Sequence, residues 1–198
     1  MTDGPRYRWL ATGAIWGPGL FMAAWLVGGL LVVGYSPVEQ HISDLAEVGA
    51  PTQGLMTLGF AGFGTGVGIA AWPLRRLIGK PAALALLVNA ILMIGIALTP
   101  TGGSADVDFV HAMLALLAYA SIAVVAPLAA IVLRRRSMVL ALVSVVVGLA
   151  TLAFLSASLG ESRSGLFQRL GLTATDLWLI AVAFGAVTGR FRGDAAGP

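Results

Sequence analysis

The chain contains no cysteine and very little charge. Without cysteine it has no disulfide framework, no thiolate metal site and no cysteine nucleophile. Only 11% of its 198 residues are charged, whereas a soluble domain carries about 25%. So small a share cannot cover a water-facing surface. The length also leaves no room for a separate soluble catalytic domain.

Apolar residues make up 58% of the sequence, with a mean hydropathy of +0.92, and they form long uninterrupted runs. A run of about 20 apolar residues is long enough to cross a bilayer as a helix, and lipid offers no partner for open backbone groups. The sequence therefore predicts an all-α polytopic membrane protein. We expect one transmembrane domain over residues 1–198, with helices at about residues 9–34, 52–74, 82–99, 108–133, 138–159 and 173–189.

The basic residues cluster at alternate ends of these runs. Ten of the twelve lie on one predicted side of the membrane, and only Arg163 and Arg169 lie on the other. Because short cytoplasmic segments are rich in Lys and Arg, both termini are predicted to be cytoplasmic. These clusters also account for the net charge of +3, so no nucleic-acid partner is expected. The ten residues are Arg6, Arg8, Arg75, Arg76, Lys80, Arg134, Arg135, Arg136, Arg190 and Arg192.

Two features of the apolar runs predict contacts between helices. Gly13 and Gly17, and Gly62 and Gly66, stand four residues apart, a spacing that lets helix backbones approach closely in lipid. Asn89 is a lone polar residue in the middle of the third run. We expect it to make a hydrogen bond to another helix.

The first outer loop, residues 35–51, is longer than a helix hairpin needs. Its middle resembles a short amphipathic helix at the membrane interface, starting near Ser36 and Pro37 and ending at residues 49–51. His41 and Asp44 are three residues apart and would share one face of that helix. We expect the helix to be ordered and to cover the ends of the bundle.

The other two outer loops add further polar residues. Asp108 and His111, again three apart, open the fourth predicted helix and could point into the bundle. Arginine side chains of the third loop could hold an anionic headgroup, since the guanidinium group suits phosphate and carboxylate. The candidate substrate-binding residues of this region are Glu161, Arg163, Gln168, Arg169 and Asp176, the last about one turn into the sixth helix.

His41, Asp44, Asp108 and His111 are the candidate catalytic residues, and we expect them to converge. They could bind zinc or a similar divalent metal in four-coordinate geometry, or form acid/base pairs in which each aspartate orients a histidine. No metal-binding signature distinguishes these alternatives. Haem is not expected, because His41 lies in a loop. The plainer alternative is that these polar residues simply occupy outer loops, with Asp108 favouring a helix N-terminus.

The first outer loop also carries a family resemblance. Its segments YSP at 35–37, HISDL at 41–45 and GAP at 49–51 resemble a bacterial and archaeal membrane family known as domain of unknown function 998. His111 and the segment GLFQR at 165–169 are similar too. The resemblance covers essentially the whole chain. It implies six helices and a shared outer-face motif, but no established activity. We expect the protein to lie in the cytoplasmic membrane of a bacterium or an archaeon.

Three functions fit these residues. The favoured one is an enzyme acting on a lipid or another amphiphile, because the polar cluster lies at headgroup depth. An accessory or binding subunit of a membrane complex is the second, and a homo-oligomer or a membrane-protein partner would suit it. The third is a small-solute transporter, although most of the predicted helices lack the mid-depth charges that carriers use.

Overall fold

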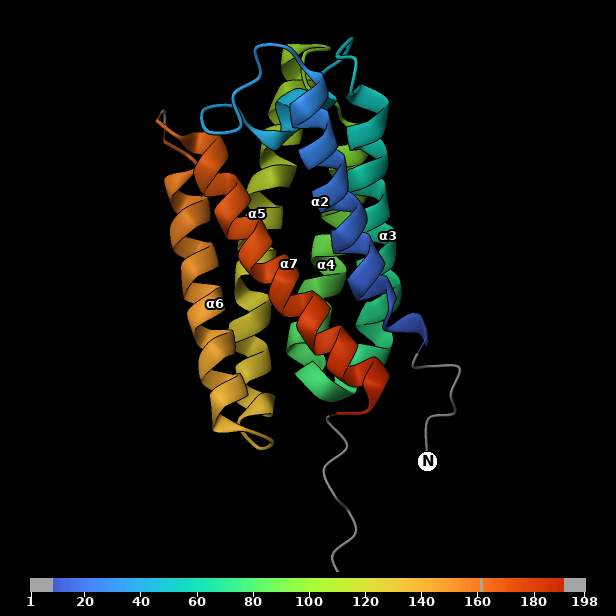
Figure 1. Ribbon diagram of the computed structural model, residues 1–198, viewed down its shortest axis with the longest axis vertical. Helices are drawn as coiled ribbons and strands as arrows, with labels where there is room; N and C mark the ends of the chain where they lie inside the picture. Colours follow the sequence, from blue (N-terminus) through green and yellow to red (C-terminus); the bar gives the residue numbers. More distant parts are fainter. Residues whose placement is uncertain (1–8, 161, 191–198) are drawn as a thin grey trace, which may run out of the picture.

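The computed structural model describes residues 9–160 and 162–190, and the described chain folds into a bundle of six long helices without strands (Figure 1). All six are long and apolar enough to cross a membrane, which confirms the predicted fold class. The helices are α2 (Gly13–Leu31), α3 (Gln53–Ile78), α4 (Lys80–Leu98), α5 (Ala105–Leu133), α6 (Met138–Ala157) and α7 (Ser164–Thr188), and a short 3-10 helix, η1 (Ile42–Ala46), precedes α3.

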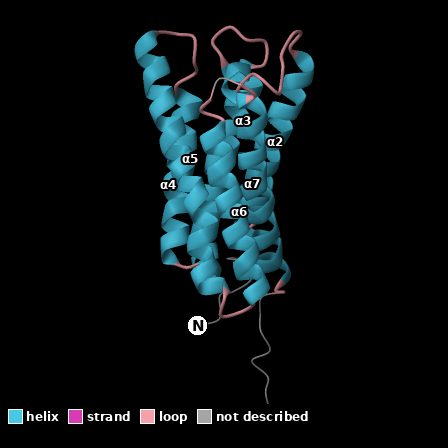
Figure 2. Ribbon diagram, turned by 90° about the vertical axis from the view of Figure 1, so that its left-hand side faces the viewer, coloured by secondary structure: helices cyan, strands magenta, loops and turns pink. Residues whose placement is uncertain are grey.

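Each helix packs against the next one along the chain, and α7 closes the bundle by packing against both α6 and α2. The connections after α2, α4 and α6 lie together at one end, which we call the loop end (Figure 2). The short connections after α3 and α5 lie at the other end, together with the start of α2 and the end of α7. The chain therefore runs from one end of the bundle to the other six times.

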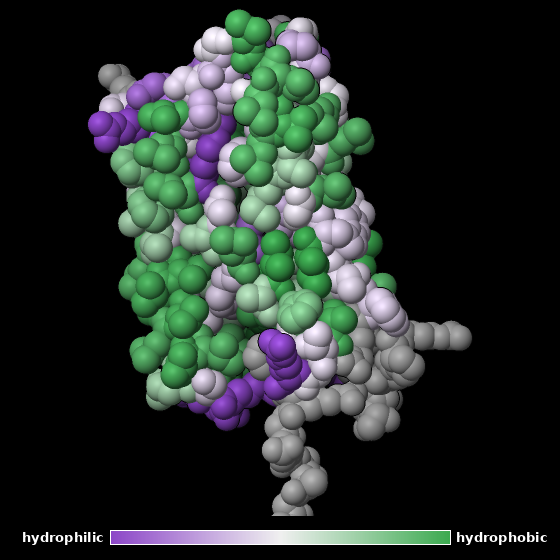
Figure 3. Space-filling view, in the orientation of Figure 1, coloured by the Kyte–Doolittle hydropathy of each residue, from purple (hydrophilic) through white to green (hydrophobic). Residues whose placement is uncertain are grey.

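The opposite end carries most of the described basic residues, and we call it the basic end. Arg75, Arg76 and Lys80 lie around the α3–α4 connection, and residues 134–136 lie between α5 and α6. Figure 3 shows hydrophilic atoms at both ends and a hydrophobic surface between them, as a bilayer requires. Arg6, Arg8 and Arg192 lie outside the described residues. The cytoplasmic location of the basic end stays a prediction.

Glycine contacts hold α2 against α3. A Cβ added to Gly13 would overlap the carbonyl oxygen of Gly66, and one added to Gly66 would meet the carbonyl oxygen of Gly13 at 2.5 Å. The two backbones are thus in direct contact, which confirms the predicted close packing. Further toward the loop end, the ring of Phe21 packs against Phe60 and Phe63, with centroids 5.5 and 5.7 Å apart.

Two predicted elements differ in extent from those observed. The last helix starts at Ser164 rather than near residue 173, because Gln168 and Arg169 are buried inside the bundle instead of lying in a loop. Asp176 is therefore 12 residues, or about 18 Å, from the start of α7. In the first loop, helical structure is limited to η1, and His41 is its N-cap residue rather than a member of its face.

Candidate functional site

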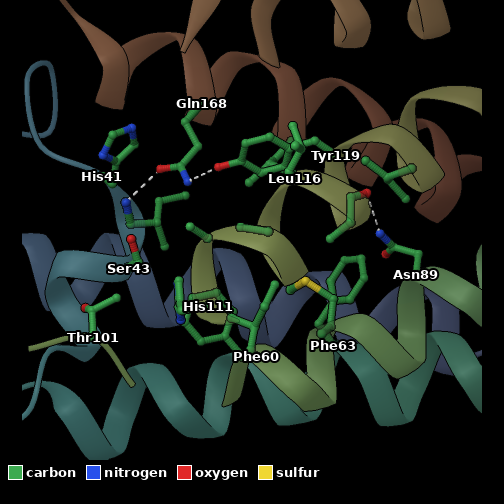
Figure 4. A pocket seen from close by; sticks show the side chains of 18 of the residues that line it. His41, Ser43, Phe60, Phe63, Asn89, Thr101, His111, Leu116, Tyr119 and Gln168 are labelled. Carbon is green, nitrogen blue, oxygen red and sulfur yellow. Dashed lines mark hydrogen bonds between the residues drawn. The ribbon is translucent and has the colours of Figure 1, made fainter. Parts of the chain in front are cut away.

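A cavity of about 290 Å³ extends from the loop end into the bundle (Figure 4). Its walls come from the first loop and from all the long helices except α6. Polar side chains line it near the loop end, whereas its deeper part is lined by aromatic and aliphatic side chains. The polar residues near the loop end are His41, Ser43, Thr101, Asp108, His111 and Gln168; the deeper part is lined mainly by apolar residues, which include Phe21, Phe60, Phe63, Met93 and Ile122.

His111 is a buried side chain of this cavity that is held in one orientation. It lies one and a half turns into α5 and is only 5% exposed. Its Nδ1 is 2.7 Å from the carbonyl oxygen of Thr99. Because a carbonyl oxygen only accepts hydrogen bonds, Nδ1 must carry the proton, and in the neutral ring Nε2 keeps its lone pair. The neutral His111 ring therefore offers an acceptor nitrogen in a fixed orientation.

His41 is oriented by the backbone and not by Asp44, contrary to the acid/base pairing predicted. Its Nε2 lies 3.3 Å from the carbonyl oxygen of Ser158 and so acts as the donor. The Asp44 carboxylate accepts a hydrogen bond of 3.1 Å from the backbone N–H of His41, which caps η1. His41 lines the cavity, whereas Asp44 does not.

Asp108 also bonds to the backbone rather than to a histidine ring. Its Oδ1 accepts a hydrogen bond of 2.8 Å from the N–H of Gly102 and so fixes the loop between α4 and α5. Asp108 shares the cavity wall with His41 and His111, so three of the four predicted catalytic residues line one space. Within the described residues, no group of three histidine, aspartate or glutamate side chains could hold a metal ion.

Gln168 joins the loop end of the cavity to its middle. Its Oε1 accepts a hydrogen bond of 2.7 Å from the N–H of Ile42, and its Nε2 donates one of 2.5 Å to the hydroxyl of Tyr119 (Figure 4). Both partners line the cavity. A single side chain of α7 thus fixes η1 on one side and α5 on the other.

Arg169 points to the first loop and is only 7% exposed. One terminal nitrogen donates to the carbonyl oxygens of Pro37 and Gln40, at 2.8 and 2.9 Å, and the other donates to the hydroxyl of Tyr35. Burial raises the pKa of Tyr35 above its ordinary value of 10.0, and Arg169 partly opposes the shift. The guanidinium group therefore fastens the loop to α7.

The remaining predicted substrate-binding residues are not brought together. Arg163 is exposed, and its backbone N–H donates to the Glu39 carboxylate at 2.9 Å. Asp176 is 1% exposed, lies outside the cavity wall, and has an Oδ2 atom without a hydrogen-bond partner among the described residues. Glu161 lies outside the described residues. Of the four that the structure describes, only Gln168 lines the cavity.

The cavity also contains residues that the sequence did not single out as a site. Tyr119 and Ser43 belong to its wall, and Asn89 lies at its deep end. Ser43 and Tyr119 stand next to the predicted polar residues only after folding, so no local spacing identified them. For Asn89, its solitary place in an apolar run was the available signal.

Of three comparisons with known proteins, one finds a match. No curated protein and no solved structure matches it. A family model described as protein of unknown function (DUF998) matches residues 15–185, which include all six helices except the ends of α2 and α7. The chain therefore belongs to the DUF998 family and is a membrane protein with six helices able to cross a bilayer.

Proposed function

We propose that this protein binds a lipid or another amphiphile in the cavity and acts on its polar group with His111 as general base. The observation that carries the proposal is the gradient of the cavity wall, which is polar beside His111 and mainly apolar below it. Along α5 the wall extends from Asp108 to Ile122, or about 21 Å of helix rise. That shape suits a polar group attached to a hydrocarbon chain.

The size and the lining favour an amphiphile over a hydrated solute. A cavity of about 290 Å³ lies near the lower limit of known ligand sites, which are mostly apolar with a few placed polar groups. A small-solute transporter would need polar groups along the whole path, whereas Phe21, Phe60 and Phe63 form the deeper wall here. With the basic end in the cytoplasm, as the sequence predicts, the cavity faces the outer leaflet.

His111 supports the chemical part of the proposal. The Thr99 carbonyl fixes both the ring orientation and the tautomer, so Nε2 is the nitrogen available to accept a proton from a bound polar group. Gln168 and η1 line the same end of the cavity as His111. The imidazole of His111 is thus fixed in orientation at the polar end of a cavity with a mainly apolar deeper wall. This arrangement would suit an enzyme that modifies the polar group of a lipid.

Binding is tested by filling the cavity. Ala115 lines it, whereas Ala120, on the same helix, is exposed and does not. The wild type, Ala115→Phe and Ala120→Phe are purified in mild detergent, and retained lipids are identified by mass spectrometry. We expect the bound amphiphile to be lost from Ala115→Phe only. Equal retention by both variants would contradict the proposed site.

Chemistry is tested separately with His111→Ala. The wild type and the variant are incubated with a total bacterial lipid extract, and changes in lipid mass are followed over time. We expect a time-dependent product from the wild type and none from His111→Ala, which should still retain the amphiphile. Product formed at the wild-type rate by the variant would exclude His111 as the base.

A further inference from the structure

Asn89 places a polar group at the deep end of the cavity. It lies midway along α4, is 2% exposed, and lines the same cavity wall as Phe63 and Ile122. Figure 4 shows its amide at the opposite end of the cavity from His41. A polar side chain at this depth needs a reason, because a buried polar group without a hydrogen bond is costly.

The neighbours of Asn89 determine which way its amide points. Its Nδ2 donates to the carbonyl oxygen of Ala118 at 2.9 Å and to the hydroxyl of Ser121 at 3.1 Å. The Ser121 hydroxyl itself donates to the Ala118 carbonyl, so its oxygen can only accept from Asn89. Both hydrogens of the amide nitrogen are thus used. A flipped amide would place two acceptors face to face.

The amide oxygen has no hydrogen-bond partner in the part of the chain that the structure describes. Asn89 Oδ1 is buried and makes no hydrogen bond among the described residues. It can only accept, so a fitting partner must supply an O–H or N–H group. A hydrogen bond between α4 and α5 needs only Nδ2. It does not explain why the oxygen of the same amide is buried without a partner among the described residues.

We infer that the bound amphiphile carries a hydrogen-bond donor, a hydroxyl or an N–H, in the middle of its chain, and that Asn89 Oδ1 accepts from it. The inference rests on the proposed function, since it describes the ligand of the same cavity. From His111 to Ala118 the helix rises by about 10.5 Å over seven residues. The donor therefore lies well below the polar group that meets His111.

The test uses three probes of equal chain length: stearate, 2-hydroxystearate and 10-hydroxystearate. Each competes with tritiated stearate for the detergent-solubilised protein in a scintillation proximity assay. We expect 10-hydroxystearate to bind about tenfold more tightly than stearate, as one buried hydrogen bond allows. The 2-hydroxy isomer, whose hydroxyl lies beside the carboxylate, should bind like stearate, which controls for the effect of a hydroxyl on partitioning into detergent.

Two variants separate the oxygen of Asn89 from its helix contact. Asn89→Leu removes Oδ1 and should abolish the preference for the 10-hydroxy isomer. Ser121→Ala removes one partner of Nδ2 but leaves Oδ1 in place, so it should keep the preference. If Asn89→Leu does not fold, the comparison of the two isomers on the wild type and Ser121→Ala still decides the question.

The outcomes distinguish this inference from the function on which it rests. Binding of stearate and 10-hydroxystearate with equal affinity would overturn the inference alone, and a trapped water would then be the better partner for Asn89. Retention of the preference in Asn89→Leu would also overturn it. Absence of binding by all three probes would overturn the proposed fatty-chain site and the inference with it.

Discussion

Replacing Arg169 by methionine should release the first loop from the bundle. Its terminal nitrogens bond to Pro37, Gln40, Gly165 and Tyr35. Since Gly165 belongs to α7 itself, three of these contacts hold the loop. Methionine keeps the length of the side chain and removes every donor. The carbonyl oxygens of Pro37 and Gln40 then lose this donor in a partly buried position.

The expected cost follows from those contacts. A hydrogen bond to a charged group contributes about 1.5–3 kcal/mol, which gives roughly 4.5–9 kcal/mol for three such bonds taken separately. Removing a buried guanidinium group also removes its desolvation penalty, which offsets part of that loss. We therefore expect a net destabilisation of about 2–4 kcal/mol, concentrated in the loop because the other helix contacts are unchanged.

Hydrogen–deuterium exchange by mass spectrometry measures this effect directly. Peptides covering residues 35–46 should exchange much faster in Arg169→Met, whereas peptides from α3 and α4 should not change. Arg163→Met is the matched control, because Arg163 is exposed and contacts the loop through its backbone N–H, which the substitution leaves in place. Equal protection of the loop in both variants would refute the view that Arg169 fastens it.

Four further predictions follow. Gly165→Ala should also free the loop, because a Cβ there would overlap the carbonyl oxygen of Gln40. Gly54→Ala is its control, since a Cβ at Gly54 meets nothing within 4 Å. Equal hydrogen–deuterium exchange of residues 35–46 in the two variants would contradict this prediction. Because folding raises the pKa of Tyr35 above 10.0, its contribution to stability is present below pH 10.0 and is lost as the pH rises through the folded pKa. Above pH 10.0 the melting temperature of the wild type should therefore fall more steeply with pH than that of Tyr35→Phe. An equal fall in both proteins would contradict the raised pKa of Tyr35. Asp176→Leu should raise the free energy of unfolding by about 1–3 kcal/mol, since it removes a buried oxygen without a partner, and a lower melting temperature would disprove that account. A reporter enzyme fused to the C-terminus should be active only in the cytoplasm, and periplasmic activity would reverse the predicted orientation.

The fold could be predicted because its main determinant is local. Each helix needs a run of apolar residues long enough to cross the bilayer, and such runs are visible without knowledge of their partners. The contact of Gly13 with Gly66 was similarly visible as a spacing of small residues. The start of α7 could not be predicted, because it depends on contacts that are not local. Gln168 and Arg169 look like loop residues until their buried partners in the first loop are known.

The site could be predicted only in part. The sequence placed His41, Asp108 and His111 at one end of the bundle, and the structure shows that they line one cavity. It could not show that backbone carbonyls, rather than aspartates, orient the two histidines. Every residue has a backbone carbonyl. Which of them accepts a hydrogen bond from each histidine depends on how the loops fold, and the sequence does not reveal it.

The few polar atoms left unsatisfied indicate where this fold departs from what stability alone requires. Three buried side-chain atoms of the described residues lack partners: Asn89 Oδ1, Arg169 Nε and Asp176 Oδ2. Arg169 and Asp176 are seven residues apart on α7, about 10.5 Å of rise, and Arg169 turns its terminal nitrogens to the first loop. Only Asn89 lies in the wall of the cavity. Departures from local rules concentrate at functional sites, and at Asn89 a bound donor would complete the hydrogen bonding that the protein itself leaves open.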